Sequence, residues 1–165
     1  MTFNIFLAVM YKDPQISVQN QDFDVNETLN SISPDAGAVA SFIGLVRADQ
    51  LQQNGHLKKV EILELDCYQD LCQKMLFNIA DQASRRWDLT NCKIIHRFGL
   101  LPVGARIVIV ATASQHRNHA LKACHYIIDW LKTDAPFWKQ QHFSDGTKSW
   151  VDVNKQDFDA QKKWL

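Results

Sequence analysis

The sequence predicts an α+β fold with a largely antiparallel or mixed sheet. Short apolar segments of strand length follow one another closely, and several neighbouring pairs can form hairpins. Between them lie two long segments whose apolar residues recur at spacings of three and four, as on one face of an α-helix. Because strand and helix segments alternate irregularly, the pattern is typical of an α+β domain.

The predicted strands share apolar content and a length suited to a sheet. The segment 107–113 is apolar on both faces, which favours a central strand. Near the C-terminus, Asp145-Gly146 is a turn signal that joins two strand segments into a closing hairpin. The predicted strands are residues 3–11, 16–19, 38–46, 60–68, 93–98, 107–113, 137–143 and 148–153.

Three helices are predicted, at 24–32, 71–87 and 117–132. Asp24 is expected to cap the first, because its side-chain oxygen can accept hydrogen bonds from the N–H groups of the first turn. Pro136 prevents the third helix from continuing. The segment 49–58 is polar and contains Asn54-Gly55, so it is predicted to be a mobile loop.

The composition predicts one globular domain. The chain has 165 residues, 46% of them hydrophobic, and its 18 basic and 18 acidic side chains cancel. Zero net charge gives no long-range basic field for nucleic acid. The four cysteines form no C-x-x-C pair, and the apolar start lacks a signal-peptide pattern, so we expect reduced thiols and a cytoplasmic protein. The single domain is expected to span 1–165, with a core of about 14–153 and a charged tail at 154–165.

Cationic side chains stand at the ends of three predicted elements, where functional groups are commonly displayed. Arg47 follows a strand, His116 and Arg117 lie at a strand-to-helix junction, and Lys132 and Lys139 flank the turn around the Pro that ends the third helix. Free N–H groups at a helix start favour an anion, and a lysine near another cation has a depressed pKa. Together they predict a cationic pocket for a phosphorylated or carboxylate-bearing small molecule.

Each of these positions also has a purely structural interpretation. Arg47 can be a solvated arginine at a strand end, and Lys132 can simply interact with the dipole of a helix C-terminus. His116 and His119 are i,i+3 neighbours, but no third ligand has a suitable spacing, so we expect no metal site. Spacing alone does not identify a reaction.

Four motifs, in order, closely resemble those of the catalytic subunits of molybdopterin synthases. The most specific is Ala-Pro-Phe-Trp-Lys at 135–139, preceded by Leu-Lys at 131–132. The others are Gly-Ala-Val…Phe-x-Gly-x-Val-Arg within 37–47, His-Arg-x-Gly at 96–99 and Ser-x-His-Arg at 114–117. The resemblance covers about residues 14 to 153.

The resemblance implies an α/β hammerhead-type fold with an additional antiparallel sheet. It also implies a homodimer that forms the core of a heterotetramer, with a small sulfur-carrier subunit docked at each end. The carrier has a ubiquitin-like fold and a C-terminal Gly-Gly thiocarboxylate. Two sulfurs from successive carriers convert cyclic pyranopterin monophosphate into the dithiolene of molybdopterin, and no metal or organic cofactor is needed.

The same resemblance assigns roles to residues. Lys132 and Lys139 correspond to catalytic lysines that also bind substrate, while Arg47, His116 and Arg117 correspond to the substrate-binding pocket. One departure is Gln141, where many such subunits have an acidic residue, so this chain either lacks the acid or supplies it elsewhere. Two alternatives remain open. One is a non-catalytic relative that binds the carrier without turnover, and the other is an unrelated binding module for a phosphometabolite.

Overall fold

The structure is a computed structural model that describes residues 12–51, 57–151 and 155–165. Its first sheet has the strand order β1 (Gln15–Gln19), β5 (Leu89–Arg97), β7 (Arg106–Ser114) and β2 (Ala38–Leu45). β1 runs parallel to β5, and the other two pairings are antiparallel. β5 and β7 are therefore the inner strands, and almost every residue of both is buried or half-buried.

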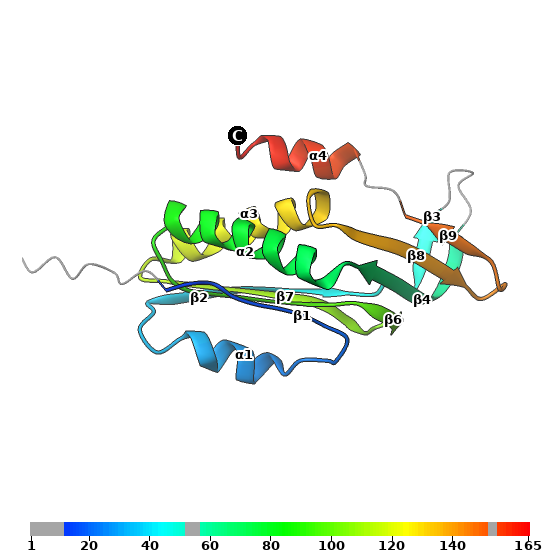
Figure 1. Ribbon diagram of the computed structural model, residues 1–165, viewed down its shortest axis with the longest axis horizontal. Coiled ribbons are helices and arrows are strands. Elements are labelled where there is room, and N and C mark those ends of the chain that lie inside the picture. The colour runs from blue at the N-terminus through cyan, green and yellow to red at the C-terminus, as the bar shows by residue number, and fades with distance from the viewer. Residues whose placement is uncertain (1–11, 52–56, 152–154) are drawn as a thin grey trace, which may run out of the picture.

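Helices cover both faces of this sheet (Figure 1). α2 (Gln69–Arg86) and α3 (Arg117–Thr133) lie side by side on one face, and α1 (Val25–Ile32) lies on the other. The main core forms between the sheet and the α2–α3 pair, where Leu76, Ile94 and Ile127 are fully enclosed. On the opposite face, Ile32 of α1 packs with Ala111 and Ala113 of β7. Val25 of the same helix packs beside Ile95 and Ile109.

A second sheet extends from one end of the first (Figure 1). It has the order β3 (Asp49–Leu51), β4 (Leu57–Cys67), β8 (Phe137–Phe143) and β9 (Lys148–Trp150), and β6 (Gly99–Pro102) pairs with β4. Every pairing in it is antiparallel. The last helix, α4 (Lys155–Lys162), packs against α3 on the side away from the first sheet.

Local sequence explains where the helices begin and end. The carboxylate of Asp24 accepts a hydrogen bond from the Glu27 N–H at 2.8 Å, which caps α1 as predicted. α3 ends at Thr133, three residues before Pro136, which cannot continue a helix. Asp88 has a φ of 46° directly after α2, a left-handed turn that leads into β5.

The predicted α+β class is confirmed, and the predicted strands and helices within the described residues are found close to their expected bounds. The predicted strand at 3–11 lies outside the described residues. The loop predicted at 49–58 is wrong at both ends, because Asp49 and Leu51 belong to β3 and Leu57 begins β4. β3 and β4 pair with Asp49 opposite Lys59, so polar residues form strands here although their composition predicted a loop. Residues 52–56 lie outside the described part.

Two further elements were not predicted. β6 is only four residues long, too short for an alternating pattern to be recognised. The segment expected to be a charged tail contains α4, which has no fully buried residue of its own and is held through contacts with α3.

Candidate active site

A cavity opens where the first sheet, the second sheet and the end of α3 come together. It consists of two adjoining hollows of about 720 and 290 Å³, which share much of their lining. The walls are apolar side chains from β2, β4, β7 and α3, including Leu45, Leu63, Leu65, Ile107 and Leu131. Charged side chains enter this apolar setting at four positions, namely Arg47, Lys132, Lys139 and Asp157.

The two lysines predicted to be catalytic both reach this cavity. Lys132 lies in the last turn of α3, and Lys139 lies in β8 opposite Leu65 of β4. Burial lowers the pKa of Lys139, with a smaller opposing effect from the carboxylate of Asp157 and a further lowering by the charge of Lys132. Lys139 therefore loses a proton more readily than an exposed lysine does.

Arg47 reaches the cavity from the first sheet. It lies two residues after the end of β2, and the backbone of the intervening Val46 is fixed by hydrogen bonds with Ala105 and Gly104, of 3.0 and 2.9 Å. The arginine side chain is exposed and lines both hollows. A guanidinium in this position can bind a phosphate or carboxylate bidentately.

His116 and Arg117 do not reach this cavity within one chain. They stand at the N-terminus of α3, whereas Lys132 stands at its C-terminus. At about 1.5 Å per residue, the fifteen positions from Arg117 to Lys132 correspond to roughly 22 Å. The single pocket predicted for all five cations is therefore formed in one chain by three of them, and the length of α3 is the reason.

The histidines at this far end show no metal geometry. The rings of His116 and His119 meet edge to face with centroids 5.6 Å apart. Within the described ranges, no group of three or more His, Cys, Asp or Glu side chains is placed to hold a metal ion. The Ser-x-His-Arg junction thus offers an exposed imidazole and guanidinium beside the free N–H groups of a helix start, an arrangement suited to an anion.

His96 lines the larger hollow, although its motif carried no predicted role. Its ring stacks on Phe137 at a centroid distance of 3.8 Å, and its Nδ1 lies 2.9 Å from the Arg97 carbonyl oxygen. Because a carbonyl oxygen can only accept, Nδ1 carries the proton in this contact. Burial, with a smaller contribution from the charge of Lys139, lowers the pKa of His96 to about 4, so the ring is neutral at physiological pH.

Asp157 is the second residue that sequence reasoning missed. It comes from α4, and its Oδ1 lies 3.4 Å from Lys132 Nζ. The sequence placed this residue in a charged tail, where no motif marked it. Gln141, the position at which an acid was expected from the resemblance, lies two residues after Lys139 in β8 and lines the smaller hollow.

The thiols are poor nucleophiles in this fold. All four cysteines are free, as predicted, and three of them are buried. Burial raises the pKa of Cys72 and of Cys92 to about 12 and that of Cys124 to about 11. Burial also raises the pKa of the partly exposed Cys67. A thiolate is the reactive form, so none of these groups is activated for sulfur chemistry.

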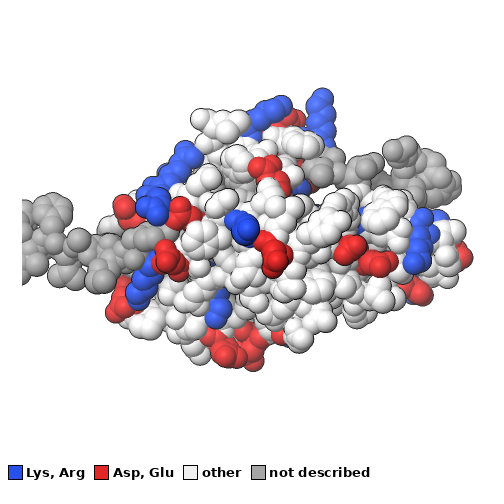
Figure 2. Space-filling view, viewed as in Figure 1, with Lys and Arg blue, Asp and Glu red and all other residues white. Residues whose placement is uncertain are grey.

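The surface carries charges of both signs. On the face shown in Figure 2, lysines and arginines alternate with acidic side chains and form no broad patch of one sign. This mixture agrees with the zero net charge of the chain. No helix in the described part of the chain is long and apolar enough to cross a membrane.

The amino-acid sequence is similar to those of known proteins over most of its length. Residues 18–134 match the family described as "MoaE protein". The chain is 43% identical over 154 residues to the molybdopterin synthase catalytic subunit of Ralstonia nicotianae, covering 92% of this chain and 84% of that one. It is 39% identical over 153 residues to the protein of the same name from Brucella melitensis, covering 90% of each.

A solved structure agrees with the sequence comparison. The molybdopterin biosynthesis MoaE protein from Burkholderia ambifaria superposes with a TM-score of 0.75 at 37% identity, covering 92% of this chain and 97% of that one. The match extends over nearly the whole length of both chains.

Proposed function

Because this chain belongs to the MoaE family, we propose that it is the catalytic subunit of a molybdopterin synthase. It transfers sulfur from the C-terminal thiocarboxylate of a small ubiquitin-like carrier subunit to cyclic pyranopterin monophosphate, which becomes the dithiolene of molybdopterin. The observation that carries this proposal is the convergence of Lys132, Lys139 and Arg47 on one cavity.

The chemistry of the cavity suits this reaction. A thiocarboxylate and a phosphorylated pterin are both anions, and three cations line the cavity. The raised pKa values of the four cysteines disfavour a protein persulfide or thioester, so the sulfur must arrive on another molecule. Free thiols and a thiocarboxylate carrier both suit a reducing compartment, and a cytoplasmic location is part of the proposal.

The two lysines take different roles. Lys132, at the mouth of the cavity, donates a hydrogen bond to the carbonyl of the carrier's terminal group and polarises it. Lys139, more enclosed between β4 and the end of α3, binds substrate and stabilises the negative charge that develops during transfer. Its lowered pKa also makes the neutral, proton-accepting form of its amine more accessible than that of an ordinary lysine.

Arg47, His116 and Arg117 bind the phosphate and pterin, and the last two act from a second copy of the chain. The length of α3 excludes His116 and Arg117 from the cavity of their own chain. In a homodimer related by a two-fold axis, the same residues of the partner can complete it. Each cavity of such a dimer would contain Arg47 and both lysines from one copy, and the His-Arg pair from the other.

Strand β2 has the position that such a dimer requires. It is an edge strand that pairs only with β7 within the described residues, and its side chains Val39, Phe42 and Leu45 are 40%, 36% and 53% exposed. Exposed apolar edge strands commonly pair with another chain. The start of β2 lies beside the start of α3, because the Gly37 N–H donates to the Ser114 carbonyl at 3.1 Å. Its other end leads to Arg47.

Antiparallel pairing of two β2 edges therefore brings the start of one copy next to the end of the other. The eight residues of β2 span about 27 Å, comparable to the roughly 22 Å that separate Arg117 from Lys132 along α3. These similar lengths support a dimer in which the His-Arg pair of one copy lies near Arg47 of the other.

Reconstitution tests the proposed activity. Purified protein is mixed with thiocarboxylated carrier and cyclic pyranopterin monophosphate, and molybdopterin is measured as its fluorescent oxidised derivative. Lys132→Ala is expected to lower turnover by about 100- to 1,000-fold, the usual loss when a transition-state donor is removed, while carrier binding survives. Lys122→Ala is the matched control, because Lys122 is an exposed residue of the same helix that does not line the cavity.

The outcomes separate the proposal from its alternatives. Carrier binding without product from the wild type indicates a non-catalytic relative, which Gln141 alone favours. Binding of phosphorylated ligands that is indifferent to the carrier indicates a phosphometabolite-binding module. Absence of both carrier binding and product contradicts the proposed function.

A mixed dimer tests the shared site. Lys132→Ala and the double variant His116→Ala/Arg117→Ala are each expected to lose nearly all activity as homodimers. In a mixed population, one site of each heterodimer keeps all its groups if the His-Arg pair acts across the dimer, so about a quarter of wild-type activity returns. If the pair acts within its own chain, every site lacks one essential group and the mixture stays inactive.

A further inference from the structure

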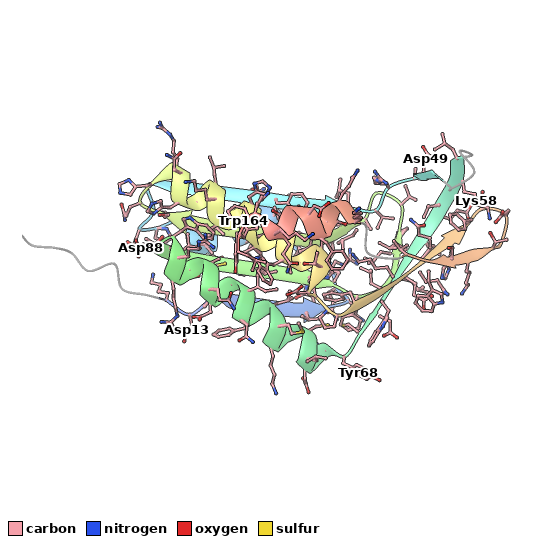
Figure 3. The ribbon with its side chains drawn as sticks, turned by 90° about the horizontal axis from the view of Figure 1, so that it is seen from above. Asp13, Asp49, Lys58, Tyr68, Asp88 and Trp164 are labelled. Carbon is pink, nitrogen blue, oxygen red and sulfur yellow. The ribbon has the colours of Figure 1, made fainter. Side chains whose placement is uncertain are left out.

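The last helix of the chain is docked beside the proposed active site. The indole Nε1 of Trp164 donates to Asp129 Oδ2 at 2.7 Å, and Gln161 Nε2 donates to Asp134 Oδ1 at 2.9 Å. The indole ring of Trp164 also meets Trp87 and Tyr126 edge to face. In Figure 3, α4 runs along the C-terminal half of α3 with Trp164 at its end. These contacts fix the orientation of α4 relative to the turn that carries Lys132.

This orientation directs one carboxylate of α4 into the cavity. Asp157 lines both hollows, its side chain is 27% exposed, and its Oδ1 lies 3.4 Å from Lys132 Nζ. No other Asp or Glu among the described residues lines either hollow. The neighbouring acid on the same helix, Asp159, is 55% exposed and instead pairs with Lys162 at 3.0 Å.

The Asp157 carboxylate shares the cavity with three cations. It restricts the motion of Lys132 and raises the pKa of Lys139. Lys132 has four rotatable bonds and is half exposed, so an unpaired ammonium there samples many positions. The contact with Asp157 restricts that motion at the place where the carrier's terminal group arrives. The charge of Asp157 also raises the pKa of Lys139, opposing the effects of burial and of Lys132.

We infer that Asp157 is a positioning residue for sulfur transfer, holding the Lys132 ammonium at the cavity mouth and balancing the charge of the lysine pair. It contacts Lys132 rather than the reacting atoms, and its role rests on the proposed function. Sulfur transfer then depends on a helix that lies outside the stretch of residues 18–134 matched by the family.

The test uses variants that remove the Asp157 carboxylate, keep it, or move it to another element. Asp157→Asn removes the charge with little change in shape, Asp157→Glu keeps it, and Asp159→Asn is the matched control on the same helix. Gln141 lies on the same strand face as Lys139 and lines the smaller hollow, so Asp157→Asn/Gln141→Glu restores a carboxylate to the cavity from a different element.

Asp157→Asn is expected to lower kcat about tenfold or more with carrier affinity unchanged, because positioning is lost and binding is not. The basic limb of its pH profile is expected to move to lower pH, since Lys139 loses the carboxylate that raises its pKa. The cationic groups that line the same hollows as this carboxylate are Lys132 from α3, Lys139 from β8 and Arg47, which follows β2. Asp157→Glu and the Gln141→Glu double variant should recover activity, and Asp159→Asn should match the wild type.

Three kinetic outcomes overturn the inference, and one NMR outcome overturns its charge-balance part. The kinetic outcomes are Asp157→Asn turnover equal to that of Asp159→Asn, turnover higher than wild type, and a loss that neither carboxylate replacement recovers. Nitrogen-15 NMR titration of the lysine side chains keeps the test independent of catalysis.

If the wild type makes no molybdopterin, the proposed function fails on its own. A lower Lys139 midpoint in Asp157→Asn still supports the charge balance, and an unchanged midpoint overturns it.

Discussion

Acidification should begin to destabilise this fold through His96 at a pH above the range in which carboxylates titrate. The ring is 6% exposed and stacked on Phe137, and burial lowers its pKa from 6.5 to about 4. In the unfolded chain the same imidazole binds a proton at about pH 6.5. Between these two values the unfolded state holds a proton that the folded state does not, so the free energy of unfolding falls as pH falls.

The magnitude follows from the width of that window. Each pH unit corresponds to about 1.4 kcal/mol for one proton, so the loss between pH 6.5 and 4 approaches about 3 kcal/mol. Above pH 6.5 the contribution is fully present. Carboxylates whose pKa is lowered, such as Asp22 beside Arg106, begin to lose their contribution as pH falls toward about 5, so the slope above that pH is the one to compare.

The assay is urea unfolding at several pH values between 7 and 4.5, comparing wild type with His96→Asn. The asparagine amide can still donate to the Arg97 carbonyl but does not titrate. The variant is expected to be less stable at pH 7, because it loses the stack on Phe137, but its stability should depend much less on pH. Equal pH slopes for the two proteins would refute the reasoning, as would an NMR midpoint for His96 near 6.5 in the folded state.

Three other perturbations follow from the packing. Gly37→Ala would place its Cβ against the carbonyl oxygen of Gln115, so we expect the free energy of unfolding, measured by chemical denaturation, to fall by about 1–3 kcal/mol. Gly146→Ala, in an exposed turn, is the control and should show only the cost of its positive φ. Trp164→Ala removes the indole contacts of α4 and should lower the free energy of unfolding by about 1–3 kcal/mol, with Trp164→Phe losing less. A thiol reagent should modify Cys67 alone in the native protein, and rapid reaction of a second thiol would contradict the burial of the other three, Cys72, Cys92 and Cys124.

The spacing of apolar residues predicted the helices and most strands, because the buried face of each element repeats with that element's own period. The stripe of Cys72, Leu76, Ile79 and Ala83 is the buried face of α2, and the Asp145-Gly146 signal is the turn between β8 and β9. Pairing between strands distant in the chain was not predictable, because each strand's pattern specifies a buried face and not a neighbour. β3 and β6 were missed because three or four residues carry too little pattern.

The motifs selected five cations as site residues, and the structure shows how these five are arranged. The five cations were identified, and Arg47, Lys132 and Lys139 meet as expected. The separation of His116 from Lys132 was implicit in the predicted length of the third helix. His116 precedes its first residue and Lys132 lies in its last turn, so the whole helix stands between them. Asp157 was beyond reach, because only tertiary contacts make its segment a helix and turn this residue inward.

The strand order of the first sheet has a consequence for synthesis on the ribosome. Gln15 pairs with Lys93 and Ala38 with Ser114, so neither N-terminal strand can find its neighbour until most of the chain has been made. Contacts between residues so distant in sequence close slowly, and until then the apolar faces of β1, α1 and β2 stay uncovered. The nascent chain therefore exposes β2, the edge proposed to join two copies, before the rest of the sheet is complete. We expect chaperone binding during translation to concentrate on this N-terminal third.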